Sequence, residues 1–418
     1  MRSLRFLLAI FPLFLFSCYK EQIIDPEFSD KAEAFNFQLT DYQEQQIYDS
    51  RGVRLSFSDT LPVLEYHDDV YGLDGFEVRG ETSLYYRRKG FSVNFDDNLF
   101  LYVEREGRIR EFEKLKMAAL VFDYTYIENF IAIEFFKEVG LWPLHSFYNE
   151  VMLNNHTQGI YLIIEDVEDY FMYEQGSDFV MRRAYHHNVD HYDLNDRIPV
   201  ESADHYLARF DSVYSFITKY SGKQLYDSLM HLVDMRQYFV KISMDMLLMN
   251  GDYTDEIFFY IKEIDGKKIF GVCPWDYDDI FQDQPHEIGR DWAVGQLFGT
   301  RTYASMDDVI ADAGEKLIFS IEDDLDYKIA TDTYLYQQYL PVLEQVLHSI
   351  DDQVIENAFA AAKTVLQPFY DKIQIVEQSN YDVNATNQNL FDSNLAGKKQ
   401  LLLNRRQWIL NELPNHLN

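Results

Sequence analysis

The segment from residue 246 to residue 281 restricts the fold of this chain more than any other part of the sequence. It reads MLLMNGDYTDEIFFYIKEIDGKKIFGVCPWDYDDIF, which is an apolar helical run, a loop, two strand-like runs and an acidic run. Asp265-Gly266 favours the positive φ angles of a type I′ turn, so the two strands are expected to form a tight hairpin. The two ends of a hairpin lie side by side. We therefore expect Asp252, before the first strand, to converge with Asp276, after the second.

Converging carboxylates indicate a site for a hard divalent cation. Mg²⁺ usually binds one or two carboxylates together with phosphate oxygens, which makes Asp276 and Asp278 candidate metal ligands. Asp252, in the earlier loop, could instead accept a proton from an attacking hydroxyl. The simpler interpretation is an exposed acidic turn, which is ordinary in a chain with 70 acidic and 37 basic residues. A calcium-binding loop is excluded, because the glycine that it requires at its sixth position is Phe281 here.

The rest of the chain divides into a strand-rich part and a helical part. Residues 36–120 contain aromatic and β-branched runs such as LPVLEYH, GFEVRG and GFSVNF, which predict strands. A helix is expected over 124–140, followed by a hairpin through Asn154 whose second strand, GIYLIIE, is continuously apolar and expected to be buried. Residues 204–250 and 305–418 are mainly helical in pattern. The sequence therefore predicts an α+β protein.

The N-terminus predicts export and lipidation. It reads MRSLRFLLAIFPLFLFSC, a charged start followed by an apolar run that is shorter than the roughly 20 residues of a membrane-spanning helix. This is the plan of a secretory signal, and its last four residues resemble a bacterial lipobox, in which Cys18 is acylated. We therefore expect a signal peptide at 1–17, a tether at 18–35 and a lipid anchor in the cell envelope. Lys20-Glu21 is similar to the sorting signal of surface-displayed lipoproteins, and an ordinary signal peptide with a chance cysteine is the alternative.

The charge of the chain restricts its partners. The formal net charge is −33, and such a surface repels nucleic acid and anionic lipid. The lipid on Cys18 is thus expected to be its only means of membrane attachment. Besides Cys18 the sequence holds one cysteine, Cys273, so an internal disulfide is not expected.

Three sequence blocks, in the same order, resemble the spore-coat-protein-H (CotH) kinase family. They are VRGETSL with RKGF at residues 78–91, GIYLIIE at 159–165 and PWDYD at 274–278. The words HRD and DFG of ordinary protein kinases are absent. The resemblance implies an atypical protein-kinase-like, two-lobed fold in one domain over 36–418, with a strand-rich N-terminal lobe to about residue 165 and a helical C-terminal lobe from about residue 166.

The resemblance also implies roles for individual residues. Asp252 takes the place of the catalytic-loop aspartate, and Asp276 that of the metal-binding aspartate, with Asp278 close behind it. Lys89 is the candidate for holding nucleotide phosphates, and Arg88 is its substitute. The plainer alternative for Lys89 is a solvated lysine on a strand.

Three further acidic residues complete the expected site. Glu165 ends the strand that would join the lobes, where nucleotide contacts are expected, unless it is a plain surface charge. Glu134 shares a face of the expected helix with Phe130, and a carboxylate on an apolar face needs a partner, so we expect it to pair with the nucleotide-binding lysine. The family often has an asparagine as a second metal ligand, and here Glu256 or Asp255 stands in that region.

The family resemblance implies an atypical protein kinase that transfers the γ-phosphoryl group of ATP to a hydroxyl of an unknown protein substrate, with Mg²⁺ and ATP as cofactors. An exported protein meets little ATP, however, and no GxGxxG loop is visible. The alternative is a non-catalytic, kinase-like binding or surface-assembly lipoprotein with an envelope partner. Mg²⁺-dependent binding of ATP distinguishes the two. A carbohydrate enzyme would need a carboxylate pair across a sugar cleft, and no resemblance supports one.

Overall fold

The computed structural model describes residues 34–67, 69–80, 82–95, 101–105, 108–123, 125–184, 188–252, 257–283, 285, 315–372 and 388–417. The expected signal peptide, most of the tether, Cys18 and Glu256 lie outside these residues. Within the described ranges, no helix is long and apolar enough to cross a membrane.

The N-terminal part is built mainly from strands. Its elements are β1 (Phe35–Gln38), α1 (Asp41–Asp49), β2 (Leu55–Phe57), β3 (Val63–Tyr66), β4 (Asp69–Arg79), η2 (Thr82–Tyr85), β5 (Gly90–Phe95), β6 (Leu101–Arg105), β7 (Arg108–Phe112), β8 (Lys114–Ala118), β9 (Ser146–Leu153) and β10 (His156–Glu165). Strands β6 and β7 form a hairpin of their own.

The main N-terminal sheet closes on itself. In the described part of the chain its strands pair in the order β2-β4-β3-β1-β9-β10-β8-β5, and β4 pairs with β5 as well, so all strands except β2 form a ring. The long strand β4 makes this possible. It pairs with β3 through its first residues and with β5 from Leu73 onward, with a register shift between Leu73 and Gly75. Such an irregularity bends a strand and helps a sheet to close. The predicted strand-rich part is thus a barrel, which the sequence did not predict.

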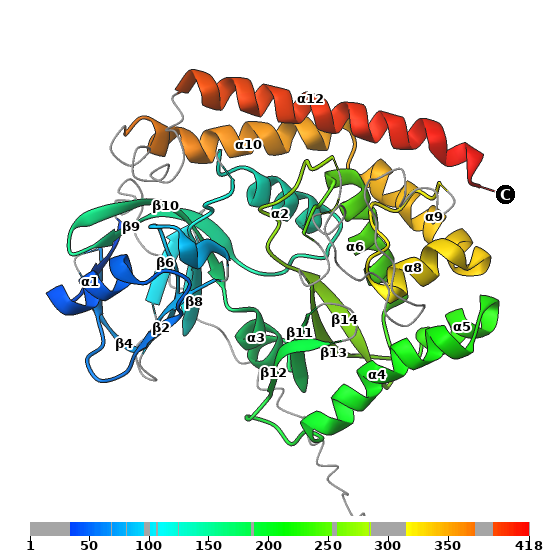
Figure 1. Ribbon diagram of the computed structural model, residues 1–418, viewed down its shortest axis with the longest axis horizontal. Helices are drawn as coiled ribbons and strands as arrows, with labels where there is room; N and C mark the ends of the chain where they lie inside the picture. Colours follow the sequence, from blue (N-terminus) through cyan, green and yellow to red (C-terminus); the bar gives the residue numbers. More distant parts are fainter. Residues whose placement is uncertain are drawn as a thin grey trace, which may run out of the picture.

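Helices dominate the remainder, as Figure 1 shows. The elements are α2 (Glu128–Glu138), α3 (Val167–Asp169), η3 (Tyr170–Glu174), β11 (Phe179–Arg183), β12 (Val189–Leu194), α4 (Ala203–Lys219), α5 (Gly222–Leu229), α6 (Met235–Leu248), β13 (Ile257–Ile264), β14 (Lys267–Pro274), α8 (Asp324–Thr331), α9 (Thr333–Ser349), α10 (Asp352–Tyr370), α12 (Gln388–Glu412) and η5 (Leu413–Asn415). Among the described residues, strands β12, β11, β13 and β14 form a second sheet in that order.

Both predicted hairpins are confirmed. Strands β13 and β14 are joined by Asp265 and Gly266, whose φ angles of 51° and 73° are those of the expected type I′ turn. Strands β9 and β10 are joined by Asn154 and Asn155, which also have positive φ angles. Asparagine tolerates this conformation better than most residues, so the local sequence is sufficient to specify the turn.

Strand β10 joins two hydrophobic cores. Its side chains alternate between opposite faces of the sheet. Tyr161 and Ile163 lie in the core of the barrel, whereas Ile160, Leu162 and Ile164 lie in the core that the helices share. This explains why the strand is apolar at consecutive positions, as the sequence predicted. The α+β class is confirmed, and the kinase-like, two-lobed arrangement stays a prediction.

Candidate functional site

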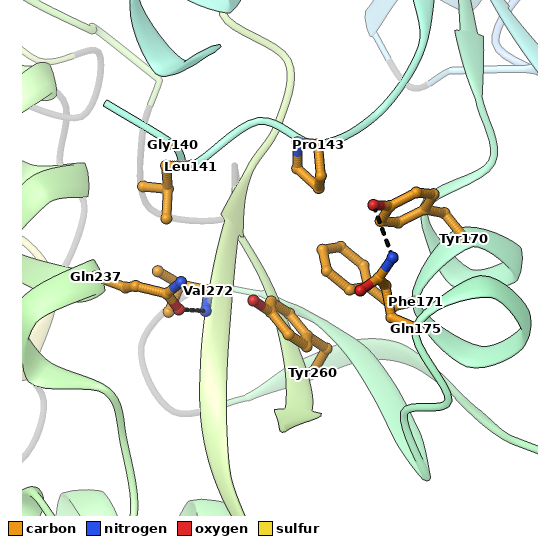
Figure 2. Close-up of a pocket in the computed structure, with 9 residues that line it drawn as sticks. All are labelled: Gly140, Leu141, Pro143, Tyr170, Phe171, Gln175, Gln237, Tyr260 and Val272. Carbon is orange, nitrogen blue, oxygen red and sulfur yellow. Dashed lines mark hydrogen bonds between the residues drawn. The ribbon is translucent and has the colours of Figure 1, made fainter. Parts of the chain in front are cut away.

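A small cavity lies beside the second sheet, but it is not lined by the acidic run. Its volume is about 120 Å³, and Figure 2 shows that aromatic and amide side chains face it. Phe171 and Tyr260 stack there with ring centroids 3.8 Å apart. The lining residues are Gly140, Leu141, Pro143, Tyr170, Phe171, Gln175, Gln237, Tyr260 and Val272. None of these residues carries a carboxylate or an ammonium group, so the cavity lacks groups that would hold Mg²⁺ or phosphate.

The acidic turn, residues 275–282, folds back onto the C-terminal end of α6. Three backbone hydrogen bonds join them, from Gly251 N to Asp279 O at 2.8 Å, from Phe281 N to Leu248 O at 2.9 Å, and from Gln282 N to Met249 O at 3.1 Å. The approach is so close that a Cβ atom on Gly251 would lie against Oδ2 of Asp279. A larger residue at this position, directly before Asp252, would therefore displace the side chains of Asp279 and Gln282.

Two aromatic residues anchor the acidic turn. Trp275 and Tyr277 are buried, and Asp276 and Asp278, which alternate with them, are half-buried. Trp275 stacks on Trp142 with 6.3 Å between the ring centroids. The Tyr277 hydroxyl donates to Oδ1 of Asp245 over 2.7 Å. The rings of Trp275 and Tyr277 are thus held in the core, while Asp276 and Asp278 stay partly exposed.

The carboxylates of the turn share one electrostatic environment. Burial raises the pKa of Asp278 well above its usual range, and the negative charges of Asp276, Glu128, Asp252 and Asp279 raise it further. The structure thus brings Asp252, Asp276 and Asp278 together, as the hairpin predicted. The catalytic and metal-binding roles expected for them stay predictions.

Oxygen donors of this kind suit Mg²⁺, although the part of the chain that the structure describes forms no complete protein cage. Among the described residues, no group of three His, Cys, Asp or Glu side chains is already arranged to hold a metal ion. Mg²⁺ usually takes one or two carboxylates and obtains its other ligands from water and substrate phosphates. Asp276 and Asp278 fit that pattern, and the expected second ligand Glu256 lies outside the described residues.

Two cationic side chains that the sequence did not indicate lie beside the acidic turn. The Arg79 guanidinium lies 5.7 Å from the ring centroid of Trp275, and the Lys116 ammonium lies 5.5 Å from it. Arg79 is also within electrostatic reach of Asp276, whose charge raises the pKa of the guanidinium while burial, the larger effect, lowers it. These residues come from β4 and β8, so barrel strands contribute positive charge to the site.

Lys116 belongs to a buried ion-pair network. Its ammonium lies 2.8 Å from Oε2 of Glu168 and 3.2 Å from Oδ2 of Asp166. Oε1 of Glu168 also lies 2.7 Å from Nε2 of His191. The positive charges of Lys116 and His191 lower the pKa of Glu168 well below its usual range, although burial opposes them. Lys116 is therefore held in place by its partners.

The cations that the sequence indicated, Arg88 and Lys89, are buried. Arg88 is buried and donates to the carbonyl oxygens of Gln158, at 2.7 Å, and Ile160. Lys89 is equally buried and donates to the carbonyl oxygen of Leu84. These bonds exclude a solvated lysine on a strand. Both residues directly precede β5, and their expected role in holding nucleotide phosphates stays a prediction that their present partners do not favour.

Glu134 differs from its expected role, and the plain surface charge offered as the alternative for Glu165 is excluded. Glu165 is buried, and its Oε2 accepts a 3.0 Å hydrogen bond from the backbone of His145. It is therefore not a surface charge, and it ties two segments of the barrel end together. Glu134 pairs with Lys137 on the surface over 2.9 Å, so the expected pair with Lys89 or Arg88 is not formed.

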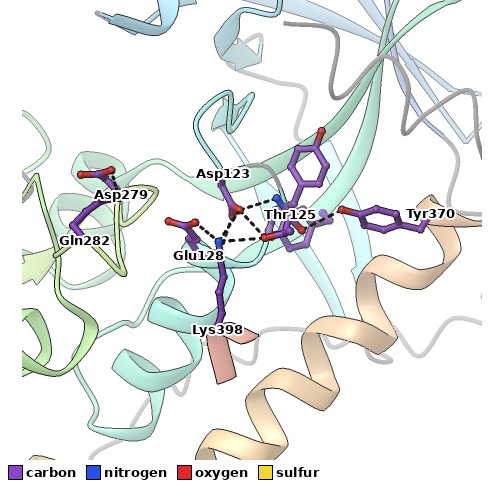
Figure 3. A network of polar contacts seen from close by, with 9 residues as sticks. Asp123, Thr125, Glu128, Asp279, Gln282, Tyr370 and Lys398 are labelled. Atoms are coloured by element: carbon purple, nitrogen blue, oxygen red, sulfur yellow. Dashed lines mark hydrogen bonds and ion pairs between the residues drawn. The ribbon is translucent and has the colours of Figure 1, made fainter. Parts of the chain in front are cut away.

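The carboxylate of α2 that does enter the site is Glu128, in the first turn of the helix. Burial and the charge of Asp123 raise its pKa to about 8. Figure 3 shows Glu128 between Asp123 and the segment that carries Asp279. Lys398 of α12 forms an ion pair with Glu128 and lies 4.0 Å from Oδ1 of Asp123. Acidic residues are common at helix N-termini, so the sequence offered little reason to single out Glu128.

Comparison with known families yields one match. The family described as CotH kinase protein matches residues 76–409, which cover most of the chain and include the acidic turn. No curated protein matches the chain.

Proposed function

Because this chain belongs to the CotH kinase protein family, we propose that it is an atypical kinase that transfers the γ-phosphoryl group of ATP to a protein hydroxyl. The observation that carries the proposal is the gathering of Asp252, Asp276 and Asp278 at the end of one hairpin. These are the residue types that phosphoryl transfer needs, namely carboxylates for a metal ion and one for the acceptor hydroxyl.

Each carboxylate has a distinct proposed role. Asp276 and Asp278 would hold Mg²⁺, which would supply positive charge to the transferring and leaving phosphates. Asp252 orients the acceptor hydroxyl and takes its proton. The acceptor oxygen forms a bond to the γ-phosphorus, the bond from that phosphorus to its bridging oxygen breaks, and ADP leaves.

We assign the nucleotide phosphates to Arg79 rather than to Lys89 and Arg88, whereas Lys116 stays paired with Glu168 and Asp166. Arg79 and Lys116 both lie over Trp275, directly before Asp276. A hydrogen bond between a cation and a phosphate is charge-assisted and contributes roughly 1.5–3 kcal/mol. The barrel then serves as the lobe that holds the nucleotide, and the helical part supplies the acidic turn.

Backbone strain supports a functional site over an ordinary acidic turn. Met249, Asp276 and Phe281 all have positive φ angles, of 56°, 47° and 67°. Such conformations cost of order 1–3 kcal/mol for residues with a side chain and concentrate at functional sites. Asp276 and Phe281 lie within the acidic turn, and Met249 caps the helix against which the turn packs. Two such residues in one short turn are unexpected if the turn only displays charge to solvent.

The alternative is a non-catalytic binding or surface-assembly protein with a kinase-like fold. It is favoured by the absence, among the described residues, of a preformed three-ligand metal site. We also propose that the chain is exported and anchored in the cell envelope through lipid on Cys18, on the strength of its N-terminal sequence. That location limits the supply of ATP.

Calorimetry of the full chain with ATP, with and without Mg²⁺, tests the proposed function. We expect ATP to bind only when Mg²⁺ is present, and labelled γ-phosphate to appear on protein in the same mixture. If ATP fails to bind at saturating Mg²⁺, the kinase proposal is wrong and the binding-protein alternative replaces it.

A further inference from the structure

The C-terminal helix α12 delivers one ammonium group to the acidic site. Lys398 forms an ion pair with Glu128, 270 residues away in the sequence, and its Nζ lies 3.4 Å from Oγ1 of Thr125. The same ammonium lies 5.5 Å from the ring centroid of Phe281, which belongs to the acidic turn. Figure 3 shows Lys398 against Glu128, Asp123 and Thr125, and its approach to Phe281 adds the acidic turn to its surroundings.

Other contacts fix the helix that carries this lysine. Arg405 donates from Nε to the carbonyl oxygen of Met246 over 3.1 Å, and Met246 lies near the end of α6 that leads to Asp252. Arg406 donates to the carbonyl oxygen of Leu347 in α9 over 2.9 Å. Helix α12 also runs alongside α10 (Figure 1). Lys398 therefore projects from a docked helix, and its position is specified by the fold.

The charges around Lys398 form one connected group. Its ammonium pairs with Glu128 and lies near Asp123. Glu128 is in turn within electrostatic reach of Asp279 and Asp278. The ammonium of Lys398 would therefore act on the same negative charge as a divalent cation bound at Asp276 and Asp278. Two cations that stabilise one acidic cluster also repel each other.

We propose that Lys398 is a built-in counter-cation of the acidic site, which stabilises the site when no divalent cation is bound and lowers its affinity for one. The inference rests on the proposed placement of Mg²⁺ at the acidic turn, but it does not need phosphoryl transfer. It assigns to α12 a role in regulating metal occupancy.

The test is a titration of the full chain with Mg²⁺ alone, followed by calorimetry, together with melting curves at increasing Mg²⁺. The variants are Lys398→Ala, Lys398→Met, which keeps the apolar stem, and Lys398→Arg, which keeps the charge. Lys399→Ala is the matched control, because Lys399 is the next residue of α12 and pairs with Glu356 at the surface.

We expect the Ala and Met variants to bind Mg²⁺ on the order of tenfold more tightly than wild type, because one repelling unit charge is removed. They should melt at a lower temperature without metal and recover at saturating Mg²⁺. The Arg variant and the Lys399 control should bind Mg²⁺ like wild type.

Three results would overturn the inference. The first is equal or weaker Mg²⁺ binding by the Ala and Met variants, with a loss of melting temperature that Mg²⁺ does not restore, which would make Lys398 a structural contact only. The second is weaker ATP binding with unchanged Mg²⁺ affinity, which would make it a phosphate ligand. The third is that neither wild type nor variant binds Mg²⁺. If the Mg²⁺ affinities and melting temperatures change as expected but no phosphate is transferred, the proposed kinase activity is wrong and the proposed role of Lys398 is kept.

Discussion

Tyr277 and Asp245 connect the acidic turn to the middle of the helical core. The tyrosine hydroxyl donates to Oδ1 of Asp245 over 2.7 Å, and Oδ2 of Asp245 lies 2.9 Å from the ammonium of Lys241. All three side chains are buried. Tyr277 lies between Asp276 and Asp278 in the chain, so helix α6 fixes the position of both candidate metal ligands through this hydrogen bond.

The first prediction concerns that bond. Tyr277→Phe keeps the ring but leaves the buried Asp245 with one hydrogen-bond donor fewer, so the free energy of unfolding should fall by about 1–3 kcal/mol. Mg²⁺ affinity should fall as well, because Asp276 and Asp278 lose their anchor. Urea unfolding and calorimetry measure the two effects. Tyr173→Phe, at a hydroxyl that bonds Asp196 near the surface, is the control. Unchanged stability in Tyr277→Phe would show that the bond does not hold the turn.

The second prediction separates the two sets of cations. Arg79→Ala should weaken Mg²⁺-dependent ATP binding about tenfold or more, because a charge-assisted contact with phosphate is lost. Lys89→Ala should lower stability without changing ATP affinity in the protein that remains folded, since its ammonium binds the carbonyl of Leu84. ATP titration beside a melting curve distinguishes them. If Lys89→Ala weakens ATP binding and Arg79→Ala does not, the phosphate ligand is Lys89.

Local chemistry explains the parts of the fold that the sequence predicted. Asp265-Gly266 and Asn154-Asn155 specify their turns through residues that tolerate positive φ. The β13–β14 hairpin then brings Asp252 and Asp276 within electrostatic reach of Asp278. None of these inferences needed knowledge of a distant segment.

Long-range pairing explains the parts that could not be predicted. Closure of the barrel depends on β4 meeting β5 and β3 at once, which no local pattern encodes. Arg79, Lys116 and Lys398 reach the acidic turn from three elements that are far apart in sequence, so the cations of the site appear only in the folded chain. The family resemblance indicated the acidic turn, whose role stays a prediction, and it assigned the cationic role to residues that are buried.

The third prediction is a pH dependence of stability that involves Glu165. Burial raises the pKa of this carboxyl group to about 8, while the His145 backbone N–H opposes the shift. The folded state therefore binds a proton that the unfolded state has released, so stability is highest below about pH 4.5 and falls as the pH rises to 8. Glu165→Gln keeps an acceptor for His145 and cannot ionise. The urea midpoints measured at pH 5 and pH 9 should differ less in this variant than in wild type. If the difference is the same in both proteins, the pH dependence of stability comes from other groups.

The fourth prediction concerns the membrane anchor. Cys18→Ser should abolish incorporation of labelled fatty acid and leave the protein uncleaved or released from the membrane, because acylation needs the thiol. Cys273→Ser is the control, since Cys273 is buried in the core and should not affect labelling. Fractionation of cells after labelling measures both the fatty acid on the protein and the share of the protein in the membrane. If label still enters the Cys18→Ser protein, the lipobox interpretation is wrong.

The last prediction compares Asp276 with Asp252, because this pair distinguishes an enzyme from a binding protein. Asp276→Ala should abolish Mg²⁺-dependent ATP binding if Asp276 holds the metal ion. Asp252→Ala should keep ATP binding and lose phosphoryl transfer by about 10²-fold or more, because only the positioning and deprotonation of the acceptor are affected. Both variants should remain folded, since each substitution removes one charge from a crowded acidic cluster.

The measurements are ATP titration and phosphate transfer with wild type and both variants side by side. An exposed acidic turn without function would give a different result, because surface substitutions change stability within about 0.5 kcal/mol and would affect no ligand. Asp283→Ala, just beyond the acidic turn, is a control for the general loss of negative charge. If Asp252→Ala loses ATP binding together with transfer, Asp252 is itself a metal ligand, because a residue that acts only on the acceptor hydroxyl has no contact with the nucleotide.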